Sequence, residues 1–213
     1  ELQVTVHQAG HAIVAYAMGV GIGAPLIAVL SARLSHKKTL IGLTALYMVG
    51  NGLTAFVPSY GYLLICRFVS GLPHGAYFGI AGIIASSLVP PSRRTQAVSR
   101  VVLGLTVATV AGVPLASIIG SALGWRWSFG LIAALALITT VLVSVVVPTD
   151  PSRPHANAMA PRRGLKNPQA WLTLGIRAVG CGGIFCVYTY LTAIMQEVLP
   201  ASSPMIAIMM AGL

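Results

Sequence analysis

Residues 62–89 read YLLICRFVSGLPHGAYFGIAGIIASSLV, a continuous apolar run that contains Arg67 and no acidic residue. A run of this length can cross the hydrocarbon core of a bilayer, which needs about 20 residues of α-helix. Lipid offers no hydrogen-bond partners, so a single span satisfies its backbone polar groups only as a helix. Gly71, Gly75 and Gly79 follow Arg67 at intervals of four residues. Small residues at this spacing let a second helix approach closely, so the stretch predicts a membrane helix with Arg67 on its packed side.

The rest of the chain has the same character. Of 213 residues, 56% are hydrophobic and 8% are charged, whereas soluble domains carry about 25% charged residues. These values exclude an ordinary soluble domain and a disordered chain, and a count of three cysteines excludes a disulfide scaffold. We therefore predict the all-α class, as a polytopic bundle of transmembrane helices. The apolar stretches that predict spans are 9–32, 39–57, 62–89, 101–123, 127–147 and 170–195.

Basic residues set the orientation of this bundle. The loops after the first, third and fifth predicted spans carry ten of the thirteen Lys and Arg residues, and the opposite side carries only Arg126. Lys and Arg in short loops mark the cytoplasmic side, so residue 1 is predicted to lie outside. The net charge of +10 then reflects topology, and no nucleic-acid partner is expected, because no loop joins basic clusters to stacking aromatics. The ten residues are Arg33, Lys37, Lys38, Arg93, Arg94, Arg100, Arg153, Arg162, Arg163 and Lys166.

The longest loop, residues 148–169, is rich in Pro, Arg, Ala and Asn and has no apolar period. This composition predicts a cytoplasmic linker between two helical groups, residues 1–147 and residues 170–213. The chain does not begin with Met, and the apolar run 205–213 has about half the length of a span. We therefore expect a fragment of a larger polytopic protein.

Catalytic and metal-binding patterns are absent from the sequence. All three acidic residues fall in loops or at span ends, which argues against carboxylate chemistry within these spans. His7 and His11 have the four-residue spacing of metal ligands on a helix, but no third ligand accompanies them. Ser70 and His74 are also four apart, with nothing to orient the histidine. We expect no enzyme activity, no metal and no cofactor.

Arg67 is the charged residue that needs an explanation. A charge at the centre of a span costs about 2.5–3.5 kcal/mol on insertion scales, so such a residue serves a purpose or reaches the interface. The glycine stripe favours an orientation into the bundle or a water-filled cavity. The alternative is a snorkelling side chain, because Arg67 lies only roughly 10 Å along the helix from Tyr60. We group His74 with Arg67 as a candidate coupling or transport residue.

Two other spans share a short Gly-x-Pro pattern. Gly23-Ala24-Pro25 lies in the first span and Gly112-Val113-Pro114 in the fourth, and the predicted topology runs these spans in opposite directions. Gly/Pro-interrupted spans at matching positions of inverted repeats are typical of the moving helices of transporters. A chance match in a Gly-rich chain is the alternative. Gly23, Pro25, Gly112 and Pro114 are therefore candidate hinge or packing residues.

The order of these features resembles the major facilitator superfamily, and within it the bacterial twelve-span drug:proton antiporters close to the arabinose-efflux-permease-like members. The stretch 67–75, RFVSGLPHG, resembles the fourth-span motif of a membrane arginine with spaced glycines. Gly112-Val113-Pro114, followed by Gly120 and by the sequence GWRWSF at 124–129, resembles the fifth-span antiporter motif. The resemblance covers nearly the whole chain, as spans two to seven and the start of span eight.

Residues 28–38 are similar to the family's loop motif between spans two and three. Arg33 and Lys37 match that motif, while Ala28, Ala32 and Ser35 replace its Gly, Asp and Gly. The resemblance implies that Arg33 and Lys37 belong to a cytoplasmic gate loop. It also implies two six-helix halves around a cavity that opens alternately to either side, with residues 1–147 in the first half and residues 170–213 beginning the second.

The function that we predict is proton-coupled export of small molecules by a monomeric, multi-pass protein of the bacterial inner membrane. The alternatives are a sugar or metabolite facilitator or uptake carrier, a membrane-embedded enzyme, and a structural bundle. The expected partners are a small-molecule substrate, protons and the lipid bilayer. Besides His74, the candidate substrate-cavity residues are Tyr16, Asn51, Tyr77, Tyr188 and Tyr190.

Overall fold

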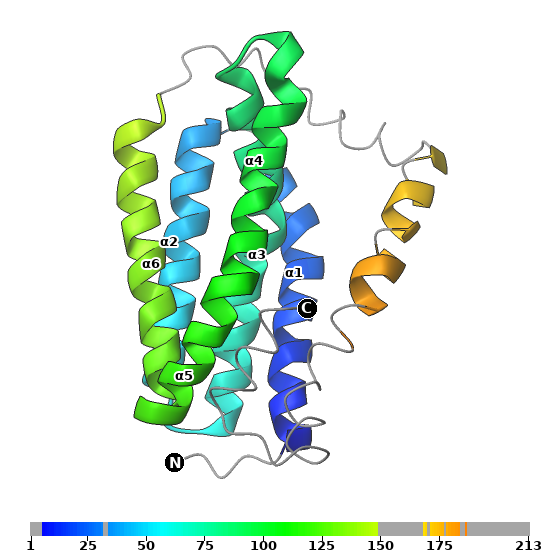
Figure 1. Cartoon of the computed structure of the whole chain (residues 1–213). Helices are drawn as coiled ribbons and strands as arrows, with labels where there is room; N and C mark the ends of the chain where they lie inside the picture. Colours follow the sequence, from blue (N-terminus) through cyan, green and yellow to red (C-terminus); the bar gives the residue numbers. More distant parts are fainter. Residues whose placement is uncertain are drawn as a thin grey trace.

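The computed structural model describes residues 6–31, 34–148, 168–169, 171–176, 178–183 and 186. All regular elements of these residues are helices, and the predicted all-α bundle is confirmed (Figure 1). Residues 168–186 are helical where they are described and coincide with the start of the sixth predicted span, whose remainder lies outside the described residues. The helices are α1 (Val6–Leu30), α2 (His36–Ala55), α3 (Tyr60–Ser87), η2 (Pro91–Arg93), α4 (Arg94–Val107), η3 (Ala108–Gly112), α5 (Val113–Leu123) and α6 (Trp125–Val146).

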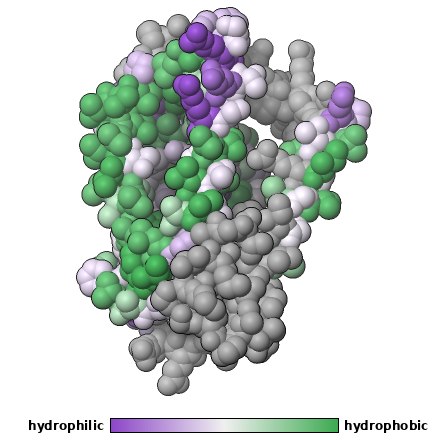
Figure 2. Space-filling view, in the orientation of Figure 1, coloured by the Kyte–Doolittle hydropathy of each residue, from purple (hydrophilic) through white to green (hydrophobic). Residues whose placement is uncertain are grey.

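Successive long helices run up and down the bundle, so alternate connections lie at the same end (Figure 1). The start of α2 and the start of α4 share one end with their basic residues, whereas the short turn before α6 lies at the other end. Figure 2 shows hydrophilic residues gathered where α4 begins and hydrophobic surface along the sides of the helices. Lys37, Lys38, Arg93, Arg94 and Arg100 thus belong to one end, as the predicted topology requires.

Four helical segments are long and apolar enough to cross a membrane, counted among the described residues. They are Gln8–Leu30, Tyr60–Ser87, Pro91–Leu123 and Trp125–Val146. The helix that contains the fourth predicted span therefore begins about ten residues before the predicted span, because Pro91 opens a helical turn that leads directly into α4. Residues 88–90 separate this helix from α3.

The second predicted span, 39–57, corresponds to α2 and is not among these four segments. It is long enough but carries more polar residues than the others. The structure places α2 against both α3 and α6, and its buried residues include Thr39, Thr44, Asn51 and Thr54. Its polar side chains therefore face neighbouring helices, which is where polar residues of membrane bundles are tolerated.

Glycines on both partners bring α1 and α3 together. These helices run parallel: Tyr60, which begins α3, donates a hydrogen bond to Gln8 O near the start of α1. A Cβ atom added to Gly19 would overlap the Phe68 carbonyl and lie 3.2 Å from Gly71 Cα. One added to Gly23 would overlap the backbone of Leu72. This contact is the close small-residue packing that the glycine stripe predicted for α3.

Only some of the predicted packing glycines lie in a close helix contact. A Cβ atom at Gly75 would lie 3.0 Å from Ala24 Cβ, so Gly75 also packs on α1. A Cβ atom at Gly79 or Gly112 would meet none of the described residues within 4 Å. Gly19, for which the sequence contains no comparable pattern, faces Gly71 across the interface.

The fourth span is interrupted by one π-helical turn, η3, between α4 and α5. Pro114 follows directly after this turn, inside the continuous helical segment Pro91–Leu123, and its missing N–H leaves one helical hydrogen bond unmade. No residue of α4, η3 or α5 is buried by the rest of the described chain. In α1, by contrast, the helix continues through Pro25 without interruption.

Candidate functional site

Arg67 lies inside the bundle, between aromatic rings from two other helices. Its guanidinium carbon lies 4.4 Å from the centroid of the Tyr16 ring on α1 and 5.3 Å from that of the Phe129 ring on α6. Guanidinium groups are attracted to the faces of aromatic rings at these distances. The orientation into the bundle is what the structure shows, and the snorkelling alternative does not fit these contacts.

No carboxylate accompanies this guanidinium in the described residues, because Glu1, Asp150 and Glu197 all lie outside them. The contacts with the two rings balance part of the charge but do not accept hydrogen bonds from all of the guanidinium N–H groups. Arg67 is therefore a fixed positive charge whose donors are not matched by an anion of the described chain. Such a group attracts an anion from another segment or from a ligand.

Tyr16 connects Arg67 to His74. The Tyr16 hydroxyl lies 2.9 Å from Nδ1 of His74, a hydrogen-bond distance, while the ring of Tyr16 carries the guanidinium. The His74 ring also packs edge-on against Phe78, with centroids 5.3 Å apart. The two residues that the sequence grouped for coupling or transport thus belong to one cluster, joined by a residue of α1.

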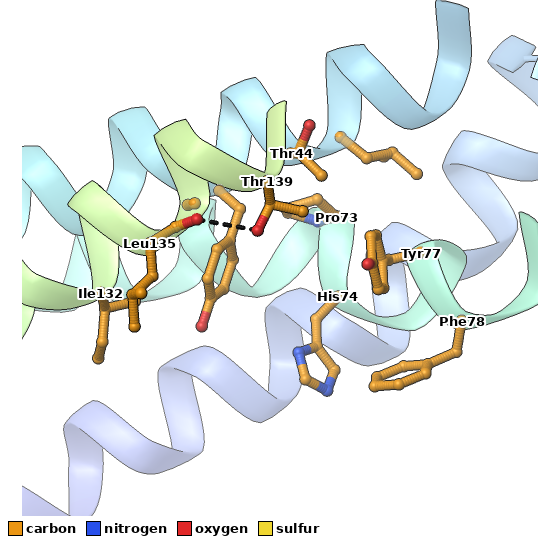
Figure 3. Close-up of a pocket in the computed structure, with 11 residues that line it drawn as sticks. Thr44, Pro73, His74, Tyr77, Phe78, Ile132, Leu135 and Thr139 are labelled. Carbon is orange, nitrogen blue, oxygen red and sulfur yellow. Dashed lines mark hydrogen bonds between the residues drawn. The ribbon is translucent and has the colours of Figure 1, made fainter. Parts of the chain in front are cut away.

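A cavity of about 300 Å³ opens beside this cluster, between α2, α3 and α6 (Figure 3). Its wall is mainly aromatic and apolar. The hydroxyls of Thr44 and Thr139 donate to carbonyls of their own helices, as the dashed line from Thr139 shows in Figure 3. A pocket with a largely apolar lining and few polar groups is typical of a small-molecule site. The lining residues are Leu43, Thr44, Tyr47, Pro73, His74, Tyr77, Phe78, Ile132, Leu135, Ala136 and Thr139.

The predicted cavity residues separate into three groups. His74 and Tyr77 line the cavity, and Tyr16 reaches it through His74. Asn51 does not line it but is fully buried, and its Nδ2 donates to Tyr47 O. Tyr188 and Tyr190 lie outside the described residues.

The other predicted functional residues lie at the ends and edge of the bundle. Lys37 stands in the first turn of α2, and Arg33, its partner in the proposed gate loop, lies outside the described residues. His11 pairs with the Tyr60 hydroxyl at 3.1 Å, joining α1 to α3. Among the described residues no group of three potential metal ligands occurs.

Several residues of this site were not predicted from the sequence. Tyr47, Phe78 and Thr139 line the cavity, and Phe129 covers Arg67. Tyr47 precedes Asn51 by one helical turn, so the choice of Asn51 carried a usable signal for it. Phe129 and Thr139 belong to α6, whose sequence gives no indication of which side faces the other helices.

These features define a class: a helical membrane protein with a small-molecule cavity and a charged residue held inside the bundle. The model of the Major Facilitator Superfamily matches residues 1–213. The chain belongs to this family.

Two relatives and one solved structure illustrate the similarity. The inner membrane transport protein YdhP of Escherichia coli K12 is 34% identical over 209 residues, which cover 98% of this chain and 54% of YdhP. A chloramphenicol resistance protein of Streptomyces lividans is 31% identical over 201 residues, 92% of this chain and 51% of that protein. The crystal structure of a bacterial homologue of the human lysosomal transporter Spinster, inward-facing and occupied, matches with a TM-score of 0.65 at 19% identity. That match covers 92% of this chain and 47% of the homologue.

The chain spans about half the length of the curated relatives it matches. The family is one of membrane transporters, and the chain is a multi-pass protein of the bacterial inner membrane.

Proposed function

We propose that the protein is a secondary active exporter that exchanges a small molecule for protons by alternating access. The family supports transport, and the name of the Streptomyces relative, a chloramphenicol resistance protein, supports the outward direction. The cavity between α2, α3 and α6 is the candidate binding place, since its lining is aromatic and apolar with few polar groups.

The placement of Arg67 carries this proposal. A positive charge held between the rings of Tyr16 and Phe129 stays beside the cavity and does not escape to the interface. Close to such a charge the ionised form of a carboxyl group is favoured, and the protonated form loses that attraction. A carboxyl group on another segment would therefore release its proton when it approaches Arg67 and bind a proton when it moves away.

The fourth span supplies a place for movement. The π-helical turn η3 and Pro114 interrupt regular hydrogen bonding at adjacent positions, and such interruptions account for most sharp bends of helices. We propose that α4 and α5 change their relative angle at Gly112 and Pro114 during the cycle. Lys37 and Arg33 belong to the proposed cytoplasmic gate, and the full protein is proposed to work as a monomer.

Vesicles with imposed gradients test the proposal. The full gene product is reconstituted into liposomes. Chloramphenicol is added with a proton gradient of either direction or with none. Export predicts accumulation that needs the gradient, reverses with its direction and disappears with a protonophore. Flux that only equilibrates the drug would show a facilitator, and flux in the opposite sense an uptake carrier; either result contradicts the proposal.

A further inference from the structure

Tyr16 serves two groups at once. Its ring lies 4.4 Å below the Arg67 guanidinium, and its hydroxyl lies 2.9 Å from Nδ1 of His74. A cation over the ring face draws electron density away from the hydroxyl oxygen. This effect makes the hydroxyl a better donor and a poorer acceptor, which favours donation from Tyr16 to Nδ1 of His74. The side chain of Tyr47 is the second hydrogen-bond partner of Tyr16.

The hydrogen bond fixes the proton on the other ring nitrogen. A neutral imidazole that accepts at Nδ1 carries its N–H at Nε2. The titratable or charged groups around His74 are Tyr16 on α1, Tyr47 on α2, and Arg67 and Tyr77 on α3, and the lining residues of α6 are not titratable. None of these groups is a carboxylate, so an imidazolium has no counter-charge among the described residues.

The cavity leaves few donors for a ligand. The hydroxyl donors of Thr44 and Thr139 are used by their own helices, and Pro73 has no N–H to offer. No charged side chain of the described chain lines the cavity. The polar side-chain groups that remain in the wall are the hydroxyls of Tyr47 and Tyr77 and the ring of His74, whose Nε2 is the nitrogen that Tyr16 does not occupy (Figure 3).

We propose that the cavity binds uncharged small molecules through an acceptor oxygen of a carbonyl, amide or nitro group on Nε2–H of His74, and that Tyr16 is the positioning residue that keeps this nitrogen protonated. The proposal rests on the proposed transport function and adds the chemistry of the ligand to it. Tyr16 itself acts through His74 and does not need to touch the ligand.

Nitrogen NMR of histidine-labelled protein tests the positioning role. His74→Gln identifies the His74 signals, and the wild-type protein should show a protonated Nε2 and an unprotonated Nδ1. Tyr16→Phe keeps the ring under Arg67 but removes the hydroxyl, so the spectrum should become a mixture of both tautomers. Tyr77→Phe is the matched control and should leave the tautomer unchanged. A wild-type Nδ1–H tautomer, an imidazolium, or an unchanged Tyr16→Phe spectrum would overturn the role of Tyr16.

Chloramphenicol, an uncharged aromatic molecule with amide and nitro oxygens, is the ligand probe. It should shift the Nε2 signal of the wild-type protein, and His74→Leu, which has no N–H donor, should weaken its binding by about tenfold, as expected for one lost hydrogen bond. Tyr16→Phe should weaken binding less, in proportion to the fraction of His74 that no longer carries its proton at Nε2. An unmoved Nε2 signal would overturn the ligand contact. Binding with the predicted shift but without gradient-driven flux would instead contradict the exporter while leaving this inference intact.

Discussion

Gly19 on α1 and Gly71 on α3 face each other so closely that a Cβ atom on either would lie 3.2 Å from the Cα of the other. The same added atoms would overlap the carbonyls of Phe68 and Tyr16. Backbone cannot move aside as a flexible side chain can, so this crossing accepts glycine alone. It also fixes the height of Tyr16 relative to Arg67, and thereby the cation–π contact at the site.

Replacing Gly71 with alanine should therefore destabilise the bundle. Gly71→Ala forces α1 and α3 apart, at a cost of about 1–3 kcal/mol as for other overpacked cores. Gly79→Ala is the matched control, because its added Cβ meets none of the described residues within 4 Å. Thermal unfolding in detergent measures both. Equal midpoints for the two variants would contradict the close crossing.

Arg126 should fasten the start of α6 to the end of α2. Its Nη1 donates to Ala55 O at 3.1 Å and its Nη2 to Val57 O at 3.0 Å. Hydrogen bonds to charged groups contribute about 1.5–3 kcal/mol each, and partial exposure of Arg126 places the expected loss at the lower end. Arg126→Gln should lower the unfolding midpoint, whereas Arg100→Gln, on an exposed surface, should not. An unaffected Arg126→Gln variant would show that the two carbonyls are equally well satisfied by water.

The predicted orientation can be tested by thiol labelling of intact cells. In a variant without native cysteines, a cysteine placed within 90–100 should resist a membrane-impermeant reagent, because the basic residues of this segment predict that it lies on the cytoplasmic side. A cysteine placed within 58–61 should react. Lysed cells provide the control in which both positions react. The reverse pattern in intact cells would invert the topology.

Gly112→Leu should separate folding from transport. Leucine is favourable in a span, and no described residue lies within 4 Å of the added Cβ, so insertion and stability should be unchanged. Gradient-driven flux should nevertheless fall at least tenfold, because the substitution stiffens and enlarges the π-helical turn beside Pro114. Gly104→Leu, on α4 and equally open, is the control that should retain flux. Normal flux from Gly112→Leu would show that η3 is no hinge.

The class of the fold and the centre of the site could be predicted from the sequence, because both depend on patterns within single helices. Apolar length fixes the spans, and the four-residue spacing of Gly71 and Gly75 with Arg67 fixes which side of α3 is packed. The sequence did not reveal Gly19, which becomes decisive only when α1 crosses α3. Phe129 likewise has no local signal, since it meets Arg67 only through the packing of α6. The polar residues of α2 lower its hydropathy. The structure explains why they are tolerated there, since other helices and not lipid surround them.

Arg67 tests the central claim most directly. Gradient-driven chloramphenicol flux is measured in liposomes for the wild type, Arg67→Ala and Arg67→Lys, with insertion checked in each. Arg67→Ala should insert at least as well as the wild type, since removing a mid-span charge is favourable, yet lose the gradient-dependent part of the flux. Arg67→Lys should keep part of it, because lysine retains the charge without the planar guanidinium that stacks on Tyr16 and Phe129. Flux by Arg67→Ala that equals the wild type across the pH range would contradict a coupling role for this charge inside the bundle.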